Sequence, residues 1–246
     1  MNRLQKEPFL QTPDGREITL YTLTNTNKTT AGILDLGGTI VSLRTSDRSG
    51  QLEEIVLAYR DPAQYLTNPM YFGSLIGRVA NRIADASFRL DDMQYTLSKN
   101  DGPNNLHSGP DGFHLRLWQA ETATTEDSAS LTLTLHSPEG DQGYPGEVDV
   151  WVRYTLDDLN RLSIQYRAQT TANTPISLTN HAYFNLGGPA CADILHHTLW
   201  IDADQFTAVN DNLIPLHHQP VAQTPFDFRE PKPIAPSIFQ EDPQLK

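Results

Sequence analysis

A nine-residue stretch, Val148-Asp-Val-Trp-Val-Arg-Tyr-Thr-Leu156, alternates between two kinds of side chain. Valine, tyrosine and leucine occupy every second position, and Asp149, Arg153 and Thr155 stand between them. Successive side chains of a β-strand point to opposite faces, so this pattern predicts a strand with one buried face. The stretch therefore indicates a β-sheet protein.

The same alternation extends outward from this strand. A polar turn, Asp157-Asp-Leu-Asn160, is followed by Leu162, Ile164, Tyr166 and Ala168 at alternate positions, which predicts a hairpin. Further strands are expected at Ile18–Leu23, Ile33–Leu43, Phe88–Leu90, Tyr95–Leu97 and Leu131–Leu135. Turn residues separate these segments, which favours an all-β fold of many antiparallel strands.

Helical spacing is limited to two stretches, Asp61–Tyr65 and Ser74–Ile83. The chain has 246 residues, a length that all-β folds often reach as one domain. No repeat, low-complexity segment or linker interrupts it. We therefore predict a single domain over residues 1–246.

The charge of the chain limits its partners. Thirty Asp and Glu against 18 Lys and Arg give a formal net charge of −12, and no basic cluster stands anywhere. Nucleic acid, anionic membrane and polyphosphorylated substrates are therefore disfavoured. A neutral polyol such as a sugar would meet no electrostatic penalty.

The chain also lacks signals for export. No apolar run of membrane-spanning length is present, and the first eight residues lack the apolar core of a signal peptide. The single cysteine, Cys191, has no internal disulfide partner, and we expect it to be buried. A cytoplasmic protein is the expectation.

Three loops concentrate Asn, Arg, His and Gly between the predicted strands, where β scaffolds commonly carry their sites. The first, 76–83, holds Asn81 and Arg82, whose amide and guanidinium suit neighbouring sugar hydroxyls. On spacing alone, this loop also fits surface arginines beside a loop-capping asparagine.

The other two loops each carry a histidine. His107 lies in the turn-rich loop 104–110, where it is either accessible to a substrate or a simple exposed turn residue. His181 lies in the loop 174–188, and along a strand it would point the same way as Tyr183. A core histidine bonded to buried neighbours fits this second pattern equally well.

Metal and nucleotide sites are not expected. The pairs His196-His197 and His217-His218 would face opposite sides of a strand, and no zinc-type spacing of His or Cys occurs. A Gly-x-Ser-x-Gly elbow and a glycine-rich phosphate loop are also missing. We predict no metal and no cofactor.

Six strings follow one another along the chain. They are Gly77-Arg-Val-Ala-Asn-Arg-Ile83, Asn105-Leu-His107, Ser137-Pro-Glu-Gly-Asp-Gln-Gly-Tyr-Pro-Gly146, Leu178-Thr-Asn-His-Ala-Tyr-Phe-Asn-Leu-Gly187, Asp211-Asn-Leu-Ile-Pro215 and Thr224-Pro-Phe-Asp-Phe-Arg229. In order and approximate spacing they resemble the aldose 1-epimerases, also called galactose mutarotases. The resemblance runs from about the first predicted strand to the last residue present.

The resemblance implies a large antiparallel β-sandwich of the galactose mutarotase-like supersandwich type. It also implies interconversion of the α and β anomers of free hexoses, such as galactose and glucose, without cofactor or metal. Ring opening needs a proton delivered to the ring oxygen and another removed from the C1 hydroxyl, so acid and base catalysis are paired.

Residue roles follow from the same resemblance. His181 resembles the general acid that acts on the ring oxygen, and His107 resembles the histidine that holds and polarises the sugar beside it. Asn81 and Arg82 resemble the pair that grips ring hydroxyls, and Tyr183 is expected to support the cleft wall.

One part of the family pattern is not found in this sequence. The family's catalytic glutamate and a sugar-binding aspartate lie C-terminal of these strings, and the C-terminal part of the sandwich that carries them is expected to be absent. A second polypeptide that supplies these strands is one alternative. The others are a non-catalytic sugar-binding remnant and a hexose-6-phosphate 1-epimerase, which would need cations beyond Arg78 and Arg82.

Overall fold

The computed structural model describes residues 2–245, and strands make up most of their regular structure. The chain forms two compact units, Met1–Phe184 and Asn185–Lys246. The interpretation of residues 1–246 as one domain stays a prediction.

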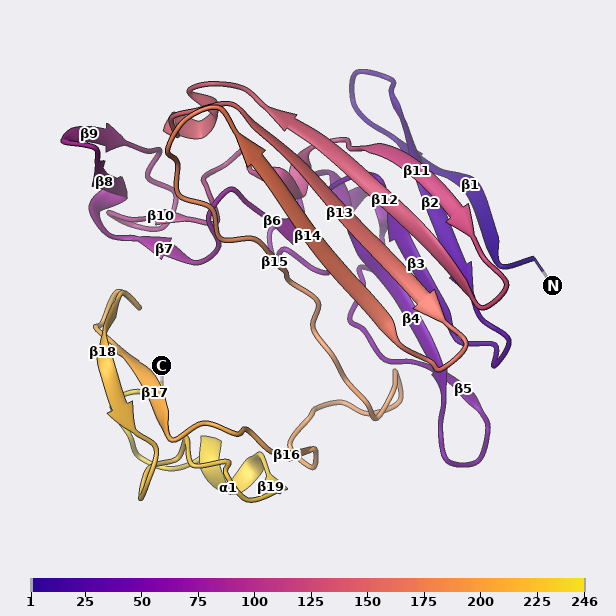
Figure 1. Ribbon diagram of the computed structural model, residues 1–246. Helices are drawn as coiled ribbons and strands as arrows, with labels where there is room; N and C mark the ends of the chain where they lie inside the picture. The colour runs from indigo at the N-terminus through magenta and orange to yellow at the C-terminus, as the bar shows by residue number, and fades with distance from the viewer. Residues whose placement is uncertain (1, 246) are drawn as a thin grey trace. The chain divides into compact units, whose positions relative to one another are not determined.

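Two antiparallel sheets dominate the first unit (Figure 1). The first has the strand order β1 (Leu4–Gln11), β2 (Glu17–Thr24), β3 (Thr30–Leu34), β4 (Ile40–Ser46) and β5 (Leu52–Glu54). The second has the order β11 (Gln119–Thr124), β12 (Ser128–Ser137), β13 (Val148–Asp157) and β14 (Leu162–Thr170). In both sheets, consecutive strands are hydrogen-bonded neighbours, and the connection between β12 and β13 is the longer segment 138–147.

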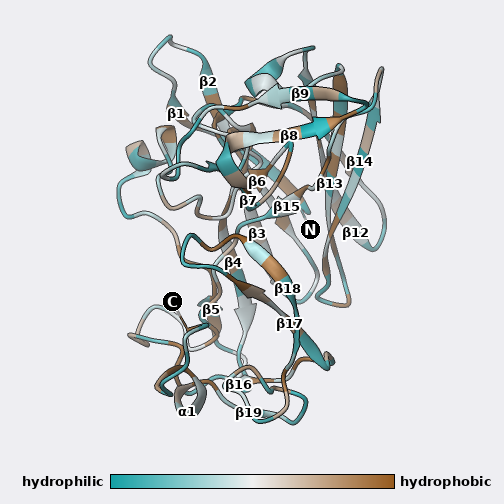
Figure 2. Cartoon of the chain, turned by 90° about the vertical axis from the view of Figure 1, so that its left-hand side faces the viewer, coloured by the Kyte–Doolittle hydropathy of each residue, from teal (hydrophilic) through white to brown (hydrophobic). Residues whose placement is uncertain are grey.

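Strand β13 is the strand that the alternating stretch predicted. It pairs with β12 on one side and with β14 on the other, with Val152 opposite both Leu133 and Tyr166. Bands of both hydropathy colours run along β13 and β14 in Figure 2. The predicted hairpin and the predicted all-β class are both confirmed.

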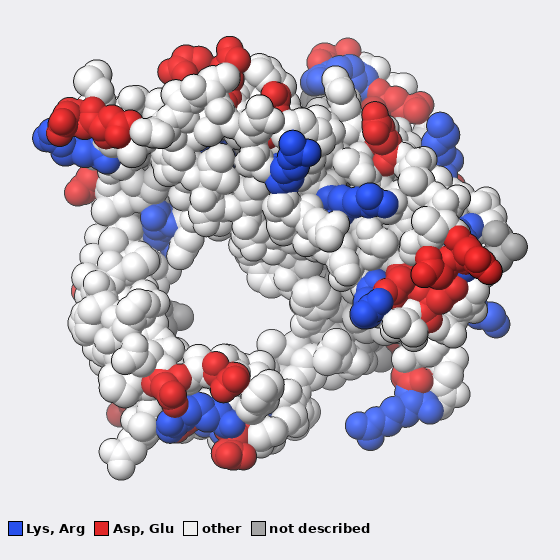
Figure 3. Space-filling view, in the orientation of Figure 1, with Lys and Arg blue, Asp and Glu red and all other residues white. Residues whose placement is uncertain are grey.

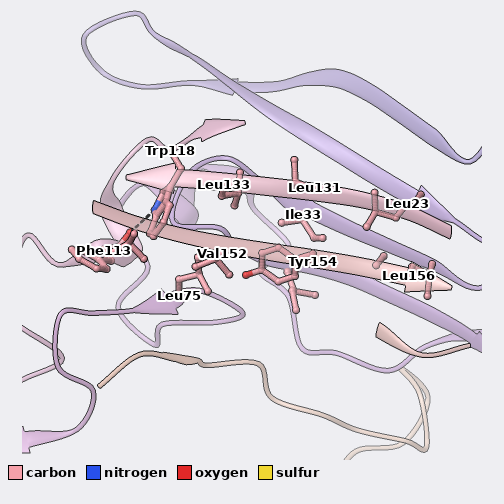
Figure 4. Close-up of a cluster of buried hydrophobic side chains, with 14 of the residues drawn as sticks. Leu23, Ile33, Leu75, Phe113, Trp118, Leu131, Leu133, Val152, Tyr154 and Leu156 are labelled. Carbon is pink, nitrogen blue, oxygen red and sulfur yellow. Dashed lines mark hydrogen bonds between the residues drawn. The ribbon is translucent and has the colours of Figure 1, made fainter. Parts of the chain in front are cut away.

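The core lies between the two sheets. Leu131 and Leu133 of β12 and the valines of β13 pack with Leu23 and Ile33 of the first sheet, and all of these side chains are almost fully buried (Figure 4). Burying each such side chain stabilises the fold by about 1.5–3 kcal/mol. Tyr154 is fully buried, and its hydroxyl donates to the carbonyl of Gly38 at 2.7 Å, which links β13 to the β3–β4 turn.

Two sequence predictions were wrong. The expected strand Ile33–Leu43 is broken into β3 and β4 by a turn in which Gly37 and Gly38 have positive φ. A Cβ on Gly37 would lie 2.2 Å from the carbonyl oxygen of His114, so the turn depends on glycine. The stretch Ser74–Ile83 forms no helix, whereas Asp61 caps a short 3₁₀ helix at Pro62–Leu66.

Three short strand pairs hold the loops that carry the predicted site residues. They are β6 (Leu75–Ile76) with β15 (Thr179–Asn180), β7 (Arg82–Ile83) with β10 (Asn105–Leu106), and the predicted hairpin β8 (Ser87–Leu90) with β9 (Met93–Thr96). Single turns of 3₁₀ helix lie at Ala84–Ala86, Phe113–Leu115 and Asp141–Gly143. Segments far apart in the sequence are thereby brought together (Figures 1 and 2).

The second unit is small and mostly irregular. It contains β16 (Thr198–Leu199) paired with β19 (Lys232–Pro233), β17 (Gln205–Val209) paired with β18 (Pro215–Pro220), and a short helix α1 (Ala235–Ile238). Phe206 and Phe226 stack at 4.4 Å. Cys191 is only partly buried, contrary to expectation, and its thiol contacts the carbonyl of Asp193.

The surface carries charges of both signs. On the face shown in Figure 3, Lys and Arg side chains lie beside Asp and Glu and do not gather into one basic patch. Within residues 2–245, no helix is long and apolar enough to cross a membrane.

Candidate active site

A cavity of about 640 Å³ opens at the end of the first unit where the short strand pairs meet. Four separate segments line it, which are 69–71, 80–82, 106–107 and 179–183. All five side chains that the sequence singled out as site residues are among the lining residues: Asn81, Arg82, His107, His181 and Tyr183.

Strand pairing explains why two of these segments meet. In the β7–β10 pair, Arg82 lies opposite Leu106, so Asn81 stands beside His107. Both residues adopt a left-handed backbone, with φ of 65° at Asn81 and 54° at His107. Such a conformation is uncommon outside glycine and recurs at functional sites. The surrounding bonds therefore hold the cavity wall in a conformation that the chain would not adopt alone.

The environment of His107 fixes its protonation. Its Nδ1 accepts a hydrogen bond from the backbone N–H of Asn81 at 3.0 Å, so the neutral ring carries its proton on Nε2. Burial, together with charge repulsion from His181 and Arg82, lowers the pKa of His107 to about 4. At neutral pH this imidazole is therefore an uncharged donor rather than an acid.

His181 lies next to His107 in the lining of the cavity. Its backbone N–H donates to the carbonyl of Ser74 at 2.8 Å, which continues the β6–β15 pairing. The ring stands 5.2 Å from the His107 ring, with the two planes at 88°. Within residues 2–245, neither ring nitrogen of His181 has a hydrogen-bond partner, so both are free to act on a bound molecule.

Arg82 is held at one edge of its guanidinium. Its Nε donates to Asp101 at 2.7 Å, and one terminal nitrogen donates to the side-chain oxygen of Asn81 at 3.1 Å. The other terminal nitrogen makes no hydrogen bond within the described residues. This arrangement orients a fork of donors and the Asn81 amide together, as recognition of neighbouring hydroxyls requires.

Tyr183 lines the cavity beside His181. Its ring lies 5.0 Å from His181 and meets Phe72 edge to face at 5.1 Å. Strand β15 ends at Asn180, so the predicted strand does not extend to these residues. The two side chains nevertheless lie next to each other.

Arg78 does not belong to the cavity. It is 2% exposed, and its guanidinium donates to the hydroxyl and carbonyl of Ser137, to the carbonyls of Pro138 and Pro145, and to the Thr174 hydroxyl. The string 137–146 is therefore the cage of a buried arginine. A phosphate-binding role for Arg78 is excluded, which removes half of the cation pair that a hexose-6-phosphate epimerase would need.

The carboxylates of residues 137–146 form hydrogen bonds and an ion pair within the fold. Asp141 accepts from the Ser137 hydroxyl at 2.5 Å and from Arg116 at 2.9 Å, and Glu139 accepts from the backbone N–H of Gly146. Among the lining residues of the cavity there is no Asp or Glu. Residues 2–245 also contain no group of three or more His, Cys, Asp or Glu placed to hold a metal ion.

Three residues at this site were not predicted from the sequence. Tyr71 lines the cavity, His114 is buried against Tyr71 with ring centroids 4.7 Å apart, and Asp101 anchors Arg82. Each comes from a segment without a recognisable pattern of its own. A hint was available only for His114, whose segment Gly112-Phe-His-Leu115 directly follows the His107 loop.

The fold and the cavity define a class of protein: an antiparallel β-sandwich with two histidines, an arginine and an asparagine around one cavity. The family model for aldose 1-epimerase matches residues 19–243. The chain therefore belongs to the aldose 1-epimerase family. The match runs through both compact units.

Curated relatives agree with this assignment. Galactose mutarotase from Sus scrofa is 44% identical over 200 residues, which cover 81% of this chain and 57% of that protein. Aldose 1-epimerase from Escherichia coli K12 is 38% identical over 244 residues, which cover 99% of this chain and 69% of that protein. The chain thus spans less than two thirds of the length of the mammalian relative.

Solved structures show the same fold. Galactose 1-epimerase from Lactobacillus acidophilus superposes with a TM-score of 0.89 at 27% identity, over 98% of this chain and 70% of that one. An aldose epimerase homologue from Caenorhabditis elegans gives 0.82 at 33% identity, over 89% of this chain and 66% of that one. The predicted β-sandwich of the mutarotase type is confirmed.

Proposed function

We propose that this chain binds free hexoses such as galactose and glucose and takes part in the interconversion of their α and β anomers. The observation that carries the proposal is the pair of imidazoles, His107 and His181, set 5.2 Å apart on one cavity that Arg82 also lines. Membership of the aldose 1-epimerase family supports anomer interconversion as the reaction.

The hydrogen-bond partners of the two histidines give them different roles in the reaction. His181, with both ring nitrogens unbonded within residues 2–245, delivers a proton to the ring oxygen as the hemiacetal opens. His107 presents an Nε2–H and stays neutral, so it polarises the same oxygen without competing for the proton. The freed aldehyde then rotates about its C1–C2 bond and recloses on its other face.

The remaining lining residues orient the sugar. Arg82 and Asn81 offer donors and an acceptor to adjacent ring hydroxyls, and Tyr183 supplies an apolar wall. Orientation of this kind keeps the ring oxygen next to His181 during the reaction.

The proton on the C1 hydroxyl also needs an acceptor. Because no carboxylate is among the lining residues, we propose that the base comes from a carboxylate beyond this lining, carried by a second polypeptide or by further family sequence. We also propose a cytoplasmic location, which the sequence predicts.

The test is the anomerisation rate of freshly dissolved α-galactose and α-glucose, followed by polarimetry with the full chain. We expect His181→Ala to lower the enzymatic rate by about 10²–10⁴-fold, the usual contribution of a positioned acid. His136→Ala, at an exposed histidine of β12, is the matched control and should keep the wild-type rate.

Two outcomes would change the conclusion. An unchanged rate in His181→Ala would remove His181 as the acid. Galactose binding without any acceleration by the wild-type chain would make it a sugar-binding protein whose cavity lacks a base.

A further inference from the structure

Tyr71 lies at the centre of the cavity wall, where three imidazoles surround its ring. The ring centroid is 4.6 Å from that of His107, 4.7 Å from that of His114 and 5.7 Å from that of His181. The two histidines to which we assign the chemistry therefore both pack on the same phenol. A molecule that reaches both of them also passes over Tyr71.

The backbone around Tyr71 is built to present this side chain. Tyr71 has a φ of 56°, a left-handed conformation that is costly for a bulky residue. Its N–H donates to the carbonyl of Asn68 at 2.9 Å. The Asn68 amide in turn donates to the carbonyl of Phe72 at 3.2 Å and to the Ser74 hydroxyl at 2.6 Å. The neighbouring bonds thus hold the ring in one place.

The hydroxyl of Tyr71 has no hydrogen-bond partner among residues 2–245. This hydroxyl is not sealed from solvent, so a bound molecule can replace water as its hydrogen-bond partner. Burial raises the pKa of Tyr71, and the negative charge of Asp101 raises it further, so the hydroxyl keeps its proton. It can therefore both donate and accept.

We propose that Tyr71 is a further substrate-binding residue, whose ring forms the apolar floor of the cavity and whose hydroxyl exchanges a hydrogen bond with a hydroxyl of the bound sugar. This inference rests on the proposed function. The three imidazoles pack on the ring, and Tyr71 lines the cavity in which the sugar would bind.

The experiment compares galactose affinities, measured by NMR titration, for the wild-type chain and for Tyr71→Phe. The variant keeps the ring and its packing on the three histidines, so folding is retained. Loss of one hydrogen bond should weaken galactose binding about three- to tenfold. Tyr95→Phe is the matched control, because that tyrosine stacks on Phe88 outside the cavity and its hydroxyl also lacks a partner in the described chain.

Deoxygalactoses locate the contact. The sugar that lacks the hydroxyl bound by Tyr71 should bind equally well to the wild-type chain and to Tyr71→Phe, whereas other deoxy sugars should keep the difference. Equal galactose affinity in both proteins would overturn the inference, as would an equal loss in Tyr95→Phe.

Failure of the proposed activity gives a different result. If the wild-type chain binds galactose without accelerating anomerisation, the catalytic proposal fails and the comparison of affinities still decides the role of Tyr71. If the wild-type chain binds no galactose, the sugar site and the Tyr71 contact are both wrong.

Discussion

Arg78 and Arg82 stand four residues apart in one segment, yet they belong to two different regions of the molecule. Arg78 is buried in a cage of carbonyls and hydroxyls, whereas Arg82 lines an open cavity and is held by Asp101 on one side only. The first arginine has no donor left for a ligand, and the second does. Burial and partners, rather than residue type, decide which arginine maintains the fold and which one faces the cavity.

The largest effect should come from the buried region. Arg78→Met would leave the carbonyls of Ser137, Pro138 and Pro145 without their donor, and we expect it to lower the free energy of unfolding by roughly 3–5 kcal/mol. Urea denaturation measures this change. The matched variant Arg82→Met should cost less than about 1 kcal/mol, since its ion pair is partly exposed. Equal losses in the two variants would contradict the distinction between the regions.

The pH dependence of stability should report on the cavity region. Burial lowers the pKa of His107 and of His114 to about 4 from an ordinary value of 6.5, so in this range the unfolded chain binds more protons than the folded one. Above pH 6.5 the two neutral histidines should contribute fully to the free energy of unfolding. As the pH drops towards 4, the free energy of unfolding should fall by about 1 kcal/mol per pH unit for each histidine.

Urea midpoints between pH 8 and pH 4 test this dependence. His114→Gln removes one of the two groups and should reduce the slope by about half. A slope that stays the same in this variant would show that His114 does not contribute to it.

A smaller effect is expected from the open region itself. Arg82→Ala removes the fork of donors beside Asn81, and galactose affinity should fall about tenfold while stability changes little. NMR titration measures the affinity. Arg82→Lys keeps the charge without the fork, and it should bind galactose with intermediate strength. Wild-type affinity in Arg82→Ala would remove Arg82 from the binding site.

Local patterns were enough to predict most of the fold. The alternation at 148–156 predicted β13 because one face of that strand is buried along its whole length. The pattern at 33–43 looked continuous because its turn residues, Gly37 and Gly38, sit between two apolar runs. At 74–83, helical spacing was misleading, because the apolar residues there are placed by distant partners such as Ser177.

The site was predicted less completely, for a related reason. Its five predicted residues lie in strings that the family resemblance made visible, and all five line the cavity. Tyr71, His114 and Asp101 have no such strings, and only tertiary packing brings them to that place. Arg78 was not among the predicted site residues, and its cage shows that it belongs to the fold and not to the cavity.

The cage of Arg78 also has a consequence for the order of folding. Its hydrogen bonds join residues 59 to 96 positions apart, and burying a guanidinium before those acceptors are in place would cost several kcal/mol. Residues 77–83 can therefore dock only after the β12–β13 connection and the segment at Thr174 have formed. Since Asn81 and Arg82 belong to that docking segment, the cavity forms late in folding. Transient opening of residues 137–146 would disrupt the cavity while the two sheets are still folded.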